Sequence, residues 1–341
     1  MQDALAELRE NMRSLVITST IPRVDGKNMT SLRFYRDYVA KNVPVIITGA
    51  MEDWPAMKIW SPKALSAFLG DAKVTIDITP DGRGDSLTTD AKYFVTPATR
   101  KMKFSHFIAI LSAKPKNLVA YCQHQNDNFT SEFKNIHSHV RPIGFAQEAF
   151  GQPPDATNIW VGDERSVSSL HRDPYENIYC VVQGTKTFTL LPPTDAPYLA
   201  EQSFPSAQYK LSNDSKKDKW SICPNVDEKS KEIQKVKWIP VDPDFPNRIP
   251  KAHPCMKRAK PDLISPIRCE VKRGELLFLP SSWFHQVSQT ETTIAVNFWY
   301  DMDFGIKWAL LQYLEKTVNS VKESEKHSEL GISCASNKHM C

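Results

Sequence analysis

The chain has 341 residues, of which 41% are hydrophobic and 10% aromatic, and its formal net charge is +4. This length can bury a large core, and the composition excludes the disordered and fibrous classes. The weak positive charge does not by itself indicate nucleic-acid binding, which needs a clustered basic face. No stretch of the sequence approaches the roughly eighteen consecutive apolar residues of a membrane helix.

The cysteines and the N-terminus predict a reducing compartment. Seven cysteines, an odd number without a C-x-x-C pair, argue against a disulfide framework and against a zinc ribbon. The first residues include acidic side chains and no apolar run of signal-peptide length, so we expect no secretion. The cytoplasm is the expected location, with the nucleus as an alternative, and we expect no membrane association.

Residues 1–120 predict a mixed α/β region that packs on the main body of the protein. Apolar residues recur at helical spacing near the N-terminus, and capped helical patterns then alternate with compact β-branched runs. Helices are expected at residues 3–15, 60–70 and 101–113, and strands at residues 43–49 and 117–123.

Residues 121–304 predict a domain built of short strands that glycine and proline punctuate. Such a series with few helical patterns is typical of a double-sheet barrel or sandwich. The two runs that flank Gly184 resemble the arms of a hairpin. The expected strands are residues 158–162, 175–183, 185–191, 267–271, 275–279, 284–288 and 292–300.

A long insert, about residues 199–262, interrupts this domain and is rich in lysine, aspartate, serine and proline. Its length predicts either a functional lid or a poorly ordered excursion, and its mixed charges are typical of a solvated surface. A helix is expected over residues 305–321, where an apolar stripe either covers the core or forms a dimer contact. We expect a homodimer. Residues 322–341 predict a flexible polar tail.

His171 and Asp173 stand two residues apart at the start of a β-branched run, so in a strand both side chains project to one face. The motif H-x-D alone is weak, and a lone histidine is more often a surface residue. With His285, however, it supplies two histidines and one carboxylate, the set that leaves three open positions on ferrous iron. Zinc accepts the same ligands, but no H-E-x-x-H segment occurs here, which favours iron.

Lys186 lies inside the next expected strand, where a buried lysine costs solvation free energy unless an anion meets it. A dicarboxylate that chelates the metal with one end and pairs with Lys186 at the other satisfies this requirement. We take this dicarboxylate to be 2-oxoglutarate.

Three ordered blocks, "SSLHRDPYENIYCVVQGTKTFTLLPP", "RCEVKRGELLFLPSSWFHQV" and "TTIAVNFWYD", resemble the jumonji-C (JmjC) oxygenases. The segment "FYRDYVAKNVPVIITGAMEDWPA" adds a resemblance to a small hydroxylase subgroup. The similarity covers most of the chain. It implies a mainly β fold with flanking helices, the double-stranded β-helix of jelly-roll or cupin-like proteins.

The resemblance also implies roles for individual residues. Fe(II) would be held by His171, Asp173 and His285. The distal carboxylate of 2-oxoglutarate would contact Lys186, Tyr121 and Ser168, and the asparagines near its chelating end would be Asn177 and Asn297. Ordinary hydrogen bonding between strands is the alternative for the two asparagines.

The activity that the resemblance implies is hydroxylation of a protein side chain with Fe(II), 2-oxoglutarate and O2. Lysine in translation-associated GTPases is the expected target, and developmentally regulated GTP-binding proteins are the candidate partners. Alternatives are a histone demethylase, a histone-tail peptidase, a tRNA-modifying hydroxylase and an inactive interaction module. Glu176, Asp301 and Asp303 are either solvated surface acids or acids that meet a cationic substrate side chain.

Overall fold

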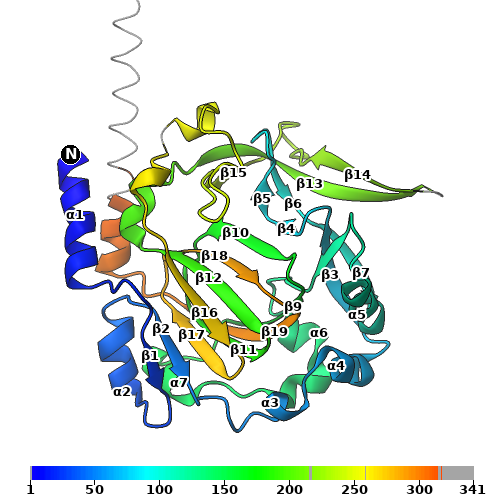
Figure 1. Cartoon of the computed structure of the whole chain (residues 1–341), viewed down its shortest axis with the longest axis horizontal. Helices are drawn as coiled ribbons and strands as arrows, with labels where there is room; N and C mark the ends of the chain where they lie inside the picture. Colours follow the sequence, from blue (N-terminus) through cyan, green and yellow to red (C-terminus); the bar gives the residue numbers. More distant parts are fainter. Residues whose placement is uncertain (1, 215–216, 258, 314–315, 317–341) are drawn as a thin grey trace, which may run out of the picture.

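The computed structural model describes residues 2–214, 217–257, 259–313 and 316. Its centre consists of two β-sheets (Figure 1). The first sheet has six strands, in the order β1 (Arg23–Asp25), β2 (Val45–Thr48), β17 (Glu275–Leu279), β11 (Tyr175–Gln183), β19 (Thr293–Asp301) and β9 (Ala156–Gly162). The second has five, in the order β16 (Ile267–Lys272), β12 (Thr185–Leu191), β18 (Phe284–Gln289), β10 (Val167–His171) and β4 (Arg83–Gly84).

The alternation of side chains along each strand separates two cores. On β11, Tyr179 and Val181 pack with Phe188 of β12 between the two sheets. Their neighbours Ile178 and Cys180 belong to the second core, which the helices cover. This period of two is what a strand buried on both faces requires. The expected mainly β fold with flanking helices is confirmed.

The hairpin expected around Gly184 is wrong. β11 pairs with β17 and β19, whereas β12 pairs with β16 and β18, so the chain crosses from one sheet to the other at this glycine. Gly184 has a φ of +77°, and a Cβ there would lie 2.6 Å from Oγ1 of Thr293. Only glycine meets both demands without strain.

The N-terminal region covers the outer face of the six-stranded sheet. The expected helices and strands occur. Ser61 Oγ accepts a hydrogen bond of 3.1 Å from the amide of Ala64, which caps helix α4 (Pro62–Leu69). A third sheet has the order β7 (Ala98–Lys103), β3 (Lys73–Thr79) and β8 (Val119–Tyr121). Among the described residues before 304, the α-helices are α1 (Gln2–Leu15), α2 (Ser31–Phe34), α3 (Pro55–Ile59), α4 (Pro62–Leu69), α5 (Phe104–Ala113), α6 (Asn128–Glu132) and α7 (Gly144–Phe150).

Helix α1 is tied to the barrel by one buried carboxylate. Arg9 and Arg13 each place a guanidinium nitrogen 2.6 Å from an oxygen of Asp195, whose side chain is fully buried. Asp195 lies in a short 3-10 helix that follows β12. The short helical turns of the chain are η1 (Tyr35–Val39), η2 (Lys134–His139), η3 (Pro193–Tyr198), η4 (Pro254–Met256) and η5 (Pro261–Leu263).

The insert forms strands that pack on the barrel. In Figure 1 the β13 and β14 hairpin projects from the molecule next to β5 and β6, and β15 pairs with β13. A separate apolar cluster joins Phe204 and Ile239 of the insert to Leu191 and Phe284 of the barrel. The strands are β5 (Ser86–Leu87), β6 (Phe94–Thr96), β13 (Gln202–Asp214), β14 (Lys217–Pro224) and β15 (Lys235–Trp238).

Strands from before residue 121 complete both central sheets, because β1 and β2 pair beside β17 and β4 pairs with β10. The proposed division at residue 120 therefore separates segments that share sheets. At the other end, residues 306–313 are helical, within the expected helix at 305–321. The last residues of that expected helix and the expected tail 322–341 lie outside the described residues. In the described part of the chain, no helix is long and apolar enough to cross a membrane.

We expect Gly184→Ala to lower the free energy of unfolding by about 1–3 kcal/mol, because the new Cβ meets both the strained φ and Thr293. Urea denaturation of the purified protein measures this. Gly144→Ala is the matched control, since nothing lies within 4 Å of its Cβ position. Equal stability of the two variants would contradict the crossing constraint.

Candidate active site

The register between β10 and β18 brings two distant histidines together. His171 and His285 are direct Cα partners in this antiparallel pair, and their ring centroids lie 4.3 Å apart. Asp173 follows the end of β10 and places Oδ2 3.7 Å from Nε2 of His171 and 3.5 Å from Nε2 of His285. One ligand atom from each residue lies within 4.8 Å of the others. The structure thus brings the three expected metal ligands to one point.

Both imidazole rings are held so that Nε2 faces the carboxylate. His171 Nδ1 lies 2.7 Å from the carbonyl oxygen of Ser169, and His285 Nδ1 lies 3.0 Å from that of Trp283. A carbonyl only accepts, so each Nδ1 carries the proton and each Nε2 keeps its lone pair. Two ligands of one ion lie roughly 3–4 Å apart because each bond is about 2 Å long. The three residues therefore fit Fe(II) with three open positions.

The protonation states also suit a metal. Burial lowers the pKa of His285 to about 4, and the neighbouring His171 adds to this effect. Burial opposes ionisation of Asp173, but His171 outweighs it and holds the pKa of this carboxyl below its usual value. Burial opposes protonation of His171, but Asp173 outweighs it and raises the pKa of this imidazole, so the two form an ion pair in the ligand-free site. A metal ion takes the place of that proton on Nε2, because an unprotonated imidazole nitrogen and an ionised carboxylate are the forms that bind a cation.

Lys186 lies inside the barrel with 1% of its surface exposed. Its ammonium group donates to Tyr121 Oη at 2.9 Å and to Oε1 of Gln289. Among the side chains that the structure describes, no carboxylate pairs with it. Burial lowers its pKa to about 7. A buried cation with only neutral oxygens around it is a site for an anion.

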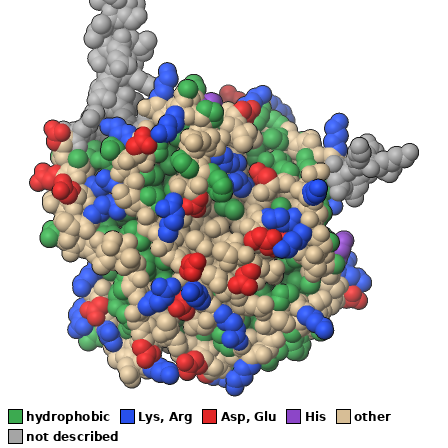
Figure 2. Space-filling view, viewed as in Figure 1, with side chains coloured by type: hydrophobic (Ala, Val, Ile, Leu, Met, Phe, Trp, Pro, Cys, Tyr) green, Lys and Arg blue, Asp and Glu red, His purple; other side chains and the backbone are tan. Residues whose placement is uncertain are grey.

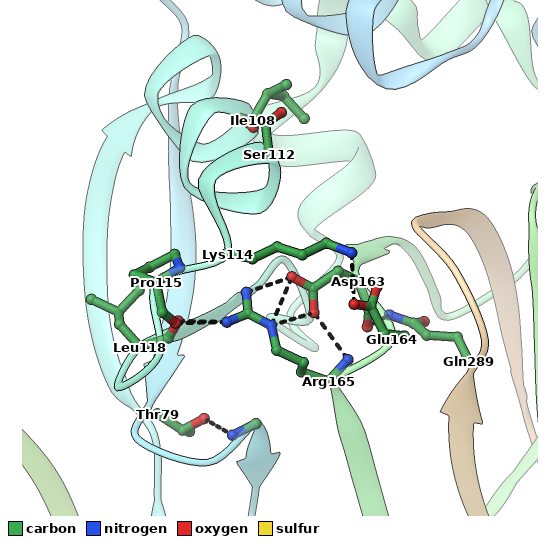
Figure 3. A network of polar contacts seen from close by, with 11 residues as sticks. Thr79, Ile108, Ser112, Lys114, Pro115, Leu118, Asp163, Glu164, Arg165 and Gln289 are labelled. Carbon is green, nitrogen blue, oxygen red and sulfur yellow. Dashed lines mark hydrogen bonds and ion pairs between the residues drawn. The ribbon is translucent and has the colours of Figure 1, made fainter.

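A loop at the end of β9 fixes the amide of Gln289 (Figure 3). Gln289 Nε2 donates to the carbonyl oxygen of Asp163, which leaves Oε1 for Lys186. The Arg165 guanidinium donates to the Asp163 carboxylate at 2.6 Å and to the carbonyl oxygen of Pro115 at 2.7 Å. The orientation of Gln289 therefore follows from its partners.

A small cavity, here called the Tyr121 cavity, joins the three metal-binding candidates to Tyr121, Ser168 and Asn177. Asn297 does not line it. Its amide accepts from Trp160 Nε1 at 2.8 Å and donates to Asn177 Oδ1 at 3.1 Å, so it supports Asn177 from behind. The contacts of Asn297 are thus hydrogen bonds to residues of neighbouring strands, the alternative that the sequence left open for the two asparagines.

The expected rim acids do not line this cavity. Glu176 is buried, and its carboxylate accepts from the amide and hydroxyl of Ser281 at 3.2 and 2.8 Å. It lines another groove, together with Asp301 and Asp303. Since Glu176 and Asn177 are adjacent on β11, their side chains face opposite sides of the sheet.

Sequence reasoning missed several residues of the site. Gln289 had a signal, because it lies four residues after His285 and so shares its strand face. Asp85 and Trp238 had none, since one lies in a short turn and the other at the end of an insert strand. Both line a second cavity, here called the Asp85 cavity, which also borders His171 and Asp173.

The chain is similar to proteins of one known family over most of its length. A family model described as a cupin-like domain matches residues 31–306. The chain is 39% identical to JmjC domain-containing protein E of Dictyostelium discoideum, over 94% of this chain and 95% of that protein. It is 38% identical to bifunctional peptidase and (3S)-lysyl hydroxylase JMJD7 of Homo sapiens, over 91% and 94%. It is also 37% identical to lysine-specific demethylase JMJ32 of Arabidopsis thaliana, over 92% and 91%.

These matches cover nearly the whole of each chain. The cluster of His171, Asp173 and His285 is the His-Asp-His arrangement typical of such enzymes. The cupin-like fold and the resemblance stated from the sequence are confirmed. The chain belongs to the JmjC family of 2-oxoglutarate-dependent oxygenases.

Proposed function

We propose that this protein hydroxylates a lysine side chain of a protein substrate, with Fe(II), 2-oxoglutarate and O2. The proposal rests on the human relative, which is named a (3S)-lysyl hydroxylase and is 38% identical over 91% of this chain. Translation-associated GTPases, with developmentally regulated GTP-binding proteins as candidates, are the proposed substrates. When bound, Fe(II) supplies the redox chemistry that couples O2 and 2-oxoglutarate to oxidation of a substrate C–H bond.

The residues of the chain have distinct tasks in this proposal. His171, Asp173 and His285 hold the metal. Lys186 pairs with the distal carboxylate of 2-oxoglutarate, and the hydroxyls of Tyr121 and Ser168 contact the same group.

Asn177 orients the chelating end of 2-oxoglutarate, and Asn297 fixes Asn177 through their hydrogen bond of 3.1 Å. The walls between these polar groups are apolar, with Phe188, Val287 and Trp299 among them. Such walls exclude water from the reacting groups.

A demethylase is the second candidate, since the Arabidopsis relative at 37% identity is named a lysine-specific demethylase. Both reactions oxidise a C–H bond. Demethylation oxidises a methyl carbon on the lysine nitrogen, and hydroxylation oxidises a carbon of the lysine side chain itself. The tRNA-modifying alternative is less well supported, because basic and acidic side chains are interspersed over the face in Figure 2 without a continuous basic stripe. The cytoplasm or nucleus is the proposed location, and the cysteines of the described residues are free.

The first prediction about function concerns the reaction. Incubation with Fe(II), 2-oxoglutarate and lysine peptides from these GTPases should add the mass of one oxygen to lysine, as mass spectrometry reads out. His171→Ala should abolish this product because it removes a metal ligand. His106→Ala, on the exposed face of α5, is the matched control.

Methylated lysine peptides separate the two candidates. Release of formaldehyde from them, without oxygen gain on unmodified lysine, would replace the hydroxylase by the demethylase. No product from either set of peptides would count against both.

The second prediction concerns pH. Because the pKa of Lys186 is lowered to about 7 in the ligand-free protein, binding of the 2-oxoglutarate dianion above that pH must take up a proton. The contribution of Lys186 should therefore lower the affinity for 2-oxoglutarate by up to about tenfold per pH unit above 7 and leave it unchanged below 7. Anaerobic titration of the metal-loaded protein measures it.

Lys186→Arg is the control for this pH dependence, since a guanidinium stays charged over the whole range. Its affinity should lose the slope that Lys186 causes. A wild-type affinity that does not change between pH 7 and about 9 would contradict the assignment of Lys186 to the carboxylate.

The third prediction concerns assembly. We propose a homodimer through the C-terminal helical residues, where Ile306 is 73% and Leu310 55% exposed. Exposed apolar side chains on one helix favour association. Light scattering should give twice the chain mass, and Ile306→Glu with Leu310→Glu should give a monomer. A monomeric wild-type protein would refute the dimer.

A further inference from the structure

The Asp85 cavity opens beside the metal centre and has a volume of about 200 Å³. His171 and Asp173 border both this cavity and the Tyr121 cavity, so the metal-binding candidates stand between the two. The proposed function places 2-oxoglutarate on the side of the Tyr121 cavity, which measures about 20 Å³ and has to widen to admit it. It leaves the Asp85 cavity as the place from which another molecule reaches the open positions of the metal.

The carboxylate of Asp85 supplies negative charge to this cavity. Asp85 follows β4, and its backbone has a φ of +50°, a conformation that residues other than glycine adopt at a cost. The hydroxyl of Ser169, in β10, donates to its carbonyl oxygen and fixes the turn against the strand that carries His171.

No lysine or arginine side chain described by the structure forms an ion pair with Asp85. Its charged neighbours are Asp77, His171 and His124, so one carboxylate opposes it and only histidines offset it. Burial, and then Asp77, raise the pKa of Asp85 to about 6, which leaves it ionised at neutral pH. A partly buried anion of this kind is stabilised when a cation binds next to it.

Trp238 gives the same cavity an aromatic wall. Its ring stacks parallel to His171, with centroids 6.2 Å apart and an interplanar angle of 7°. Phe94 packs against Trp238 at a tilt of 47°, with ring centroids 4.5 Å apart. The cavity also has one cationic residue in its lining, Arg172, whose guanidinium lies over the ring of Phe284 at 5.2 Å and 3.9 Å from the carboxylate of Glu201. An aromatic face beside an uncompensated carboxylate is the combination that binds an alkylammonium group.

We propose that Asp85 and Trp238 form the subsite that selects a cationic side chain of the substrate, with Asp85 pairing with the ammonium group and Trp238 covering the alkyl chain. This inference rests on the proposed function, because it places a lysine beside the metal centre. It adds the residues that recognise that lysine. The insert thereby contributes to specificity through Trp238, at the end of β15.

Binding of two small probes tests the subsite without any turnover. Nα-acetyl-lysine amide and Nα-acetyl-norleucine amide differ by the ammonium group alone, and ligand-observed NMR measures their affinities for the metal-loaded, 2-oxoglutarate-bound protein under anaerobic conditions. Wild type should prefer the lysine probe by about tenfold to a hundredfold, as expected for a charge-assisted hydrogen bond. Asp85→Asn should lose this preference while its norleucine affinity stays close to that of wild type.

Asn is chosen because it tolerates a positive φ, so the turn is kept. Asp71→Asn, at a side chain that is 83% exposed, is the matched control and should bind both probes as wild type does. Trp238→Leu should weaken both probes alike, since it removes the apolar wall and leaves the carboxylate.

An Asp85→Asn protein that keeps the lysine preference would overturn the subsite, as would a wild type that binds both probes equally or neither. The outcome is separate from that of the peptide reaction. Preference for the lysine probe without hydroxylation of lysine peptides would refute the proposed function alone. Hydroxylation with an unchanged preference in Asp85→Asn would refute the subsite alone.

Discussion

The ammonium group of Lys186 is the charge that the barrel interior has to accommodate. It is buried, and its contacts, Tyr121 Oη and Gln289 Oε1, are neutral. Gly162 makes room for both partners, because a Cβ there would lie 2.6 Å from the Tyr121 ring and 2.8 Å from the Gln289 amide. The backbone therefore leaves space for the two partners of the Lys186 ammonium group. The free-energy cost of desolvating this cation is offset when an anion binds beside it.

The pairing of β12 with β18 sets the distance between this cation and the metal centre. Lys186 is the Cα partner of Gln289, and Leu190 is the partner of His285. An even separation of four residues keeps His285 and Gln289 on one face, roughly 13 Å apart along the strand. A slip of one residue would turn both toward the opposite face. The register thus fixes the separation between the metal centre and the cation that we assign to the two ends of 2-oxoglutarate.

Much of this arrangement could be predicted from sequence, because strand periodicity is a local property. The expected strand boundaries from residue 156 onward lie within a few residues of the observed ones. His171 and Asp173 meet as expected, although β10 ends at His171 and Asp173 follows it, so strand alternation alone does not place the carboxylate. The hairpin at Gly184 failed because a crossing between sheets and a tight turn leave the same local pattern. Pairing depends on residues far away in the chain, and so does the contribution of Asp85 and Trp238.

Lys186 and Asp85 carry opposite charges near the metal-binding candidates, and in the proposals above this difference separates the two ligands. Arg172 also lines the Asp85 cavity, but its guanidinium lies over the ring of Phe284. An anion beside Lys186 gains an ion pair, whereas beside Asp85 and Asp77 it meets further negative charge. A cation experiences the reverse. Exchanging the two ligands would therefore place like charges together on both sides of the metal centre, which costs free energy in a buried site. In the proposals above, the residues assigned to the co-substrate and to the substrate thus also disfavour an exchange of the two ligands.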